Sequence, residues 1–193
     1  MIRRAVFASF FVLVLSAANV LAATKTVSIL ASSYSPASVT VALGGSVQWK
    51  NTTGKKHTVT SDATFLWTSI VVKPHKTSQP LAFKEAGTFA YHDSLKAGAH
   101  GSVVVPMMAD AVDVTIPGEV MLTLGTAQPT GPVWHQVEAR LNGGTWSLIA
   151  TTEGNTTGFQ PSTAGTWELQ TRLHQGLSGG DSGWSPIVTI TAE

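Results

Sequence analysis

The stretch Gly87–Val105, GTFAYHDSLKAGAHGSVVV, constrains the fold more than any other part of the chain. It opens with Thr88, Phe89 and Tyr91 and ends in three consecutive valines. Aromatic and β-branched residues favour strands, and the glycines and small residues between them favour a tight loop. The sequence therefore predicts a strand, a short loop and a second strand here.

This stretch resembles the copper-binding loop of cupredoxins such as plastocyanin, azurin and the phytocyanins, whose frame runs roughly G-T-Y-x-Y-x-C-x-x-H-x-x-M-x-G-x-V-x-V. Asp93 stands at the Cys position of that frame, Lys96 at the His position and Ala99 at the Met position. The remaining ligand position is matched by His57, in VQWKNTTGKKHTVTSD. The resemblance implies a cupredoxin-like Greek-key β-sandwich over residues 23–106 that has lost its type 1 copper ligands.

Two interpretations of this loop stay open. The chain has no cysteine, which excludes a blue-copper centre because that centre needs a thiolate. His57, Asp93 and His100 could instead form a non-blue site for Cu(II), Zn(II) or Fe(II), although the frame puts His100 one place past the Met position. The alternative is that Asp93 pairs with Lys96 or hydrogen-bonds to His57, which would close the site without a metal.

Residues 1–22 resemble a signal peptide, with Arg3 and Arg4 before the apolar run Ala5–Leu15 and small residues near Ala22. We expect cleavage after Ala22, with an uncleaved anchor as the alternative. No later apolar run is long enough for a transmembrane segment. The sequence therefore predicts a secreted or periplasmic protein.

Residues 107–193 restart a β pattern after a short linker. Trp134, Gln136 and Glu138 alternate with His135, Val137 and Ala139 as the two faces of a strand, and Asn142-Gly143-Gly144 is a hairpin turn signal. The segments VWHQVEAR, GTWELQTRL and GWSPIVTIT resemble strands of fibronectin type III modules. We therefore expect an all-β chain of two consecutive β-sandwich domains, the second fibronectin type III-like or immunoglobulin-like.

Charge is divided between the halves. Residues 23–106 carry eight lysines against three acids, a net charge of +5, whereas residues 107–193 carry two arginines against eight acids, a net charge of −6. This division indicates either drift between two domains or a head-to-tail contact between basic and acidic domains, within or between molecules. Four tryptophans of the second half are expected to pack in the core or on a sheet face, with carbohydrate stacking as the alternative: Trp134, Trp146, Trp167 and Trp184.

The sequence contains no recognisable catalytic set: no Ser/His/Asp arrangement in context, no paired carboxylates and no phosphate-binding loop. We therefore predict a non-enzymatic, exported protein without copper that acts through protein or cell-surface contacts, including self-association, and does not bind nucleic acid. The alternative is a metal-binding cupredoxin with a non-blue site, related to electron carriers. The sequence names neither the partner nor the oligomeric state.

Overall fold

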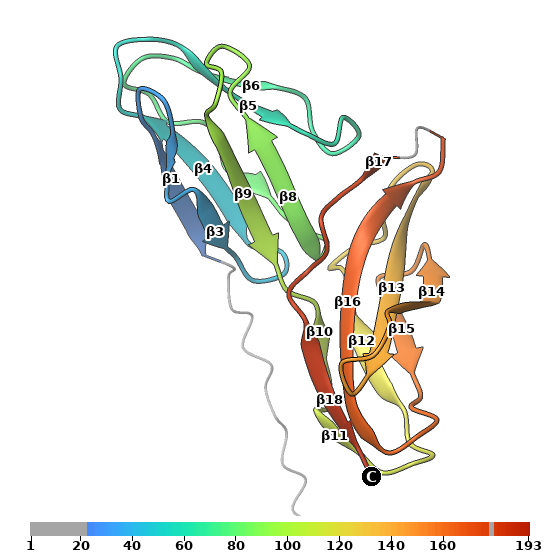
Figure 1. The fold of residues 1–193 in the computed structure, drawn as a ribbon. Helices are drawn as coiled ribbons and strands as arrows, with labels where there is room; N and C mark the ends of the chain where they lie inside the picture. The colour runs from blue at the N-terminus through green and yellow to red at the C-terminus, as the bar shows by residue number, and fades with distance from the viewer. Residues whose placement is uncertain (1–22, 178–179) are drawn as a thin grey trace, which may run out of the picture.

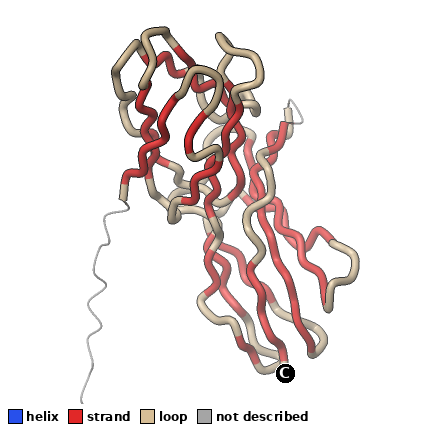
Figure 2. Tube along the Cα trace, turned by 60° about the vertical axis from the view of Figure 1, so that its left-hand side comes forward, coloured by secondary structure: helices blue, strands red, loops and turns tan. Residues whose placement is uncertain are grey.

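The computed structural model describes residues 23–177 and 180–193, so the expected signal peptide lies outside the described residues. These residues form strands and turns and no helix, which confirms the all-β prediction (Figure 2). In this part of the chain, accordingly, no helix is present that could cross a membrane. The strands gather into two bodies joined end to end (Figure 1).

The first body contains two sheets. The four-stranded sheet has the order β2-β1-β4-β7, and the five-stranded sheet has the order β3-β9-β8-β5-β6. Their strands are β1 (Thr24–Ile29), β2 (Tyr34–Ser35), β3 (Ser38–Thr40), β4 (Ser46–Asn51), β5 (His57–Ser61), β6 (Ile70–Val72), β7 (Leu81–Ala82), β8 (Gly87–His92) and β9 (His100–Val105). β8 and β9 form the expected strand–loop–strand unit, with Thr88 opposite Val104.

The core of the first body lies between its two sheets. One sheet contributes Val47 and Trp49, and the other contributes Phe89, Tyr91 and Val103. Alternate residues of β8 point inward, as the strand period of two requires. A Cβ on Gly101 would lie 2.5 Å from the Tyr91 ring, so only glycine allows the two strands to meet under that ring.

The second body also contains two sheets. The three-stranded sheet has the order β10-β12-β15, and the larger sheet has the order β11-β18-β16-β13-β14 with β17 beside β16. Their strands are β10 (Met108–Ala109), β11 (Asp113–Val114), β12 (Val120–Thr123), β13 (Val133–Leu141), β14 (Ser147–Thr152), β15 (Thr156–Phe159), β16 (Gly165–Gln175), β17 (Gly180–Asp181) and β18 (Val188–Ala192). Leu122 and Phe159 of the smaller sheet pack with Leu169 and Ile190 of the larger one.

The hairpin turn predicted at Asn142-Gly143 joins β13 to the segment before β14. Asn142 and Gly143 have φ angles of 50° and 70°, the two consecutive positive values that a type I′ turn needs. Asparagine and glycine tolerate this backbone better than other residues do. The alternation predicted for β13 is also confirmed, since Val133, His135, Val137 and Ala139 are buried and the residues between them are not.

Backbone hydrogen bonds connect the two bodies. The Ala86 N–H donates to the Leu124 carbonyl at 2.8 Å, and Thr88 and Gly183 exchange two N–H···O bonds of 2.8 Å. Val133 and Leu173, from the second body, pack against the core of the first. The junction is therefore a bonded interface.

Candidate functional site: the His57–Asp93 end of the first sandwich

His57 and Asp93 meet at the end of the first sandwich that lies away from the second. His57 is the first residue of β5, and Asp93 directly follows β8, which pairs with β5. The His57 Nδ1 and Asp93 Oδ2 atoms are 2.5 Å apart, and the two residues are 4% and 3% exposed. A buried imidazole and a buried carboxylate thus form a direct pair.

The remaining polar atoms of this pair also have protein partners. Asp93 Oδ1 accepts hydrogen bonds of 3.0 Å from the Thr58 N–H, the Thr58 hydroxyl and the Leu95 N–H. His57 Nε2 lies 2.9 Å from the Thr53 hydroxyl. Both ring nitrogens of His57 and both carboxylate oxygens of Asp93 are therefore engaged within the protein.

These contacts set the ionisation of Asp93. Burial alone would raise the pKa of the Asp93 carboxyl, because it penalises the charged form. The hydrogen bonds from His57, Leu95 and Thr58 outweigh burial and hold that pKa below its usual value. Asp93 consequently stays a carboxylate throughout the neutral range.

The loop after Asp93 closes on itself. The Asp93 N–H donates to the Ala99 carbonyl at 3.0 Å, and the Lys96 N–H donates to the Asp93 carbonyl at 3.1 Å. Ala99 is buried, whereas Lys96 is exposed and, within the described chain, forms no ion pair. The sequence offered two metal-free contacts for Asp93, an ion pair with Lys96 and a hydrogen bond to His57. The structure contains the bond to His57.

His100 lies elsewhere. It sits opposite His92 across β8 and β9, with ring centroids 6.2 Å apart, and His92 Nδ1 is 2.5 Å from Asp62 Oδ1. The structure therefore brings His57 and Asp93 together and places His100 in a separate, solvent-facing group. Residues 23–177 and 180–193 contain no set of three His, Cys, Asp or Glu side chains arranged to hold a metal ion.

A family model described as a cupredoxin-like domain matches residues 5–105, more than half of the chain. The chain belongs to the cupredoxin-like domain family. Among curated proteins, none matches it. Solved structures similar to it include a reduced mutant of amicyanin and a Cu(I) form of another amicyanin mutant, at 29% and 30% identity; each match covers 42% of this chain and 81% of the amicyanin chain, with a TM-score of 0.39.

Copper is the metal that this family normally binds, so the residues at this end of the cupredoxin-like domain can be tested for their fit to it. Ala99 offers no donor atom, and Lys96 offers an ammonium group, which repels a cation. A metal at His57 would have to displace either Asp93 or Thr53 from a ring nitrogen. As arranged, the side chains do not fit a copper ion.

The surface around the pair is basic. Asn51 Nδ2 donates to the Lys55 and Lys73 carbonyls at 2.7 and 3.1 Å, which ties the loops after β4 and β6 together. We call this surface the basic end; its exposed lysines are Lys55, Lys56, Lys73, Lys76 and Lys96. In the described residues, none of these lysines lies in an ion pair.

Unpaired acids gather toward the opposite end of the molecule, near β11 and the C-terminal strand β18 (Figure 1). We call this surface the acidic end; its residues are Asp113, Glu119 and Glu193. Other acids of the second sandwich are engaged on its larger sheet: Glu168 with Arg140, and Asp181 with Arg172 and His174. The basic end and the acidic end therefore lie at opposite ends of the long axis of the molecule (Figure 1).

One polar pair of the structure corresponds to no motif in the sequence. Glu85 Oε2 and His135 Nε2 are 3.0 Å apart across the junction between the sandwiches, and His135 is fully buried. His135 could be recognised only as an inward position of a predicted strand. Nothing in the sequence connects it to a glutamate fifty residues earlier.

Proposed function

We propose that this protein is exported and acts through its surfaces as a binding or structural component, having lost the copper ligands of its cupredoxin relatives. The observation that carries the proposal is the His57–Asp93 pair. The atoms of both side chains that could bind a metal are hydrogen-bonded to other protein groups instead. A buried, fully satisfied polar network favours one arrangement. Such an end suits a stable scaffold better than a metal-exchange site.

The second sandwich is assigned, as part of the same proposal, to the fibronectin type III-like modules. Its three-stranded sheet β10-β12-β15 faces a larger sheet in which β18, β16, β13 and β14 are neighbours. This division of strands agrees with a seven-stranded Greek-key sandwich plus short additions. Modules of this class support a role in adhesion or assembly.

The partner is proposed to be another copy of this chain, bound head to tail. The basic end and the acidic end lie far apart on one molecule, so they cannot neutralise each other within it (Figure 1). Between molecules the two surfaces are complementary, and complementary charge steers association and selects the orientation. A contact between two different surfaces is heterologous and propagates into chains or rings.

Charge exchange tests this partner. One variant carries Lys55→Glu, Lys56→Glu, Lys73→Glu and Lys76→Glu, and the other carries Asp113→Lys and Glu119→Lys. We expect the mature chain, residues 23–193, to self-associate at low salt in sedimentation velocity, and each variant alone to be monomeric. The two variants mixed together should associate again, because each then offers the charge that the other lacks.

Lys25→Glu with Lys84→Glu is the matched control, since these lysines lie outside the basic end; it should associate like the unaltered chain. A monomeric unaltered chain at low salt would rule out self-association. Variants that associate alone, or a mixture that stays monomeric, would show that these two ends do not meet.

Family membership favours one alternative, a metal protein that uses His57, Asp93 and His100. Calorimetric titration of Cu(II) and Zn(II) into the untagged mature chain decides between the two functions. We expect no binding that depends on His57, so His57→Ala and the exposed control His75→Ala should behave alike. One equivalent of metal that is lost in His57→Ala and kept in His75→Ala would contradict the metal-free proposal.

A further inference from the structure

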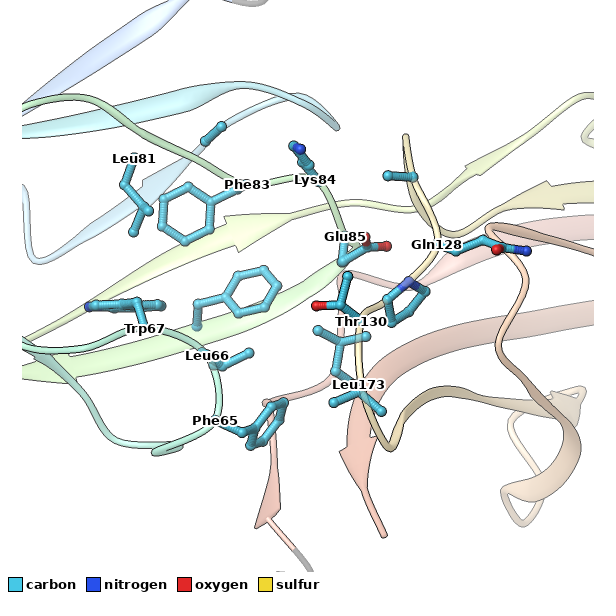
Figure 3. Close-up of a pocket in the computed structure, with 15 residues that line it drawn as sticks. Phe65, Leu66, Trp67, Leu81, Phe83, Lys84, Glu85, Gln128, Thr130 and Leu173 are labelled. Atoms are coloured by element: carbon cyan, nitrogen blue, oxygen red, sulfur yellow. The ribbon is translucent and has the colours of Figure 1, made fainter. Parts of the chain in front are cut away.

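A cavity of about 330 Å³ lies where the two sandwiches meet (Figure 3). The first sandwich lines it from the segment after β5 and from β7 to β8, and the second lines it from the loop before β13 and from the end of β16. Its apolar wall is built from Phe65, Leu66, Trp67, Leu81, Phe83 and Phe89. Neither sandwich alone would form it.

The aromatic rings of this wall are held by one another. The Trp67 and Phe83 rings meet edge to face with centroids 5.8 Å apart, and the Phe83 and Phe89 centroids are 5.4 Å apart. The Trp67 N–H also donates to the Val59 carbonyl at 3.3 Å. Rings fixed in this way form a ready surface for a flat apolar group.

The junction holds the two sides of the cavity at a fixed separation. The Thr126 N–H, just before the lining loop 127–130, donates to the Lys84 carbonyl at 2.8 Å. Glu85 and Gly125 form an isolated β-bridge next to this bond. The cavity is therefore preformed, as small-molecule sites usually are.

Glu85 supplies the carboxylate among the lining residues. Its Oε2 atom is 3.0 Å from His135 Nε2, and its side chain keeps 14% of its surface exposed. Lys84 is the neighbouring cation, but its ammonium group and the Glu85 carboxylate point in different directions (Figure 3). Lys84 is also exposed to water, which screens its charge.

We propose that this cavity binds a small organic cation with an aromatic body, of the arylalkylamine class. The ring packs on the wall of Trp67, Phe83 and Phe89, and the ammonium donates to Glu85. A charge-assisted hydrogen bond is about twice as strong as a neutral one. A volume near the low end for ligand pockets suits a molecule with one ring.

This site is separate from the proposed surface contacts at the two ends of the molecule, so either proposal can fail without the other.

Three probes of matched shape test the charge preference: phenethylamine, phenethyl alcohol and phenylpropanoate, each titrated into the mature chain by calorimetry. We expect the amine to bind about tenfold tighter than the alcohol, because only the amine makes a charge-assisted bond, and the acid to bind most weakly. Glu85→Gln should weaken the amine about tenfold and leave the alcohol unchanged. Lys84→Gln is the matched control and should keep the preference.

A second pair of variants tests the location without touching the charges. Thr130 points toward the aromatic wall, whereas the amide of Gln128 points away from it (Figure 3). Thr130→Phe should fill the cavity and weaken all three probes at least about tenfold, and Gln128→Phe should not. Equal binding of the three probes, no saturable binding of the amine, or full binding to Thr130→Phe would each overturn the proposal.

Discussion

Two histidine–carboxylate pairs in this chain, each with a buried histidine, use the same chemistry but differ in how completely their polar atoms are bonded. In the His57–Asp93 pair both ring nitrogens have partners, and Asp93 accepts three further hydrogen bonds. In the His135–Glu85 pair, His135 Nδ1 is buried without a partner in the described part of the chain. The first pair is a complete network, and the second is a partial one.

The difference follows from what each pair connects. His57 and Asp93 belong to one sandwich, where Thr58 of β5 and Leu95 of the loop after β8 donate to Asp93. Glu85 and His135 face each other across the junction of two sandwiches, and their side chains share the single hydrogen bond between Glu85 Oε2 and His135 Nε2. A complete network fixes local structure, whereas the second pair leaves the buried His135 Nδ1 atom without a partner. The first pair closes the cupredoxin-like end, whereas the second lies beside the junction cavity, which Glu85 lines.

Asp93→Ala should have the largest effect on stability. It would leave the His57 imidazole and the Thr58 N–H buried without an acceptor, which costs about 3–5 kcal/mol of unfolding free energy for a buried pair that loses one member. Urea unfolding followed by tryptophan fluorescence measures the loss. Lys96→Ala in the same loop is the control and should change stability by less than about 0.5 kcal/mol. A loss below about 1 kcal/mol in Asp93→Ala would show that the network is not structural.

Lowering the pH tests the same pair without removing the Asp93 side chain. The pKa of Asp93 is lower in the folded chain than in the unfolded chain, so its contribution is fully present above the unfolded value, about 3.9. The contribution is lost as pH falls through the lower folded value. Urea midpoints between pH 7 and pH 2.5 should therefore fall more steeply for the unaltered chain than for Asp93→Asn. If the urea midpoints of the two proteins fell in parallel with pH, Asp93 would not have a lowered pKa in the folded chain.

At the junction the expected effect is smaller. Glu85→Ala removes one hydrogen bond to a partly exposed carboxylate, so we expect a loss of about 1–3 kcal/mol. Because the bond joins the two sandwiches, the unfolding transition should also broaden or split into two steps. Glu153→Ala, which removes an acceptor of the Trp134 N–H on the open sheet face, should leave the transition single. An unchanged, sharp transition in Glu85→Ala would mean that this pair does not couple the sandwiches.

Sequence patterns that act locally predicted the fold well. The loop frame of Gly87–Val105 predicted the β8–β9 unit, and Asn142-Gly143 predicted its turn, because glycine and β-branched residues restrict the backbone directly. The frame also placed His57 close to Asp93. It did not place His100 with them, and strand alternation explains why His100 and Asp93 face different sides.

The junction could not be predicted in the same way. Glu85 meets His135, and Ala86 meets Leu124, only because two separately patterned sandwiches dock at one particular angle. No periodicity or motif encodes that angle, and every residue involved has an ordinary role within its own strand or loop. A site between two domains can therefore be found only in the structure, even where each domain is recognisable from its sequence.

The smallest effect on stability is expected at a third pair, which differs from the His57–Asp93 pair in its exposure to solvent. Asp62 and His92 are 2.5 Å apart like the Asp93 pair, but their side chains are 44% and 36% exposed. Water screens exposed pairs, so Asp62→Ala should cost at most about 1 kcal/mol and nothing measurable in about 1 M salt. The cost of Asp93→Ala should persist at that salt concentration, since the side chains of His57 and Asp93 are only 6% and 0% exposed. Urea unfolding of both variants with and without salt separates the two cases, and an Asp62→Ala loss that salt leaves unchanged would show that distance, not burial, sets the strength of these pairs.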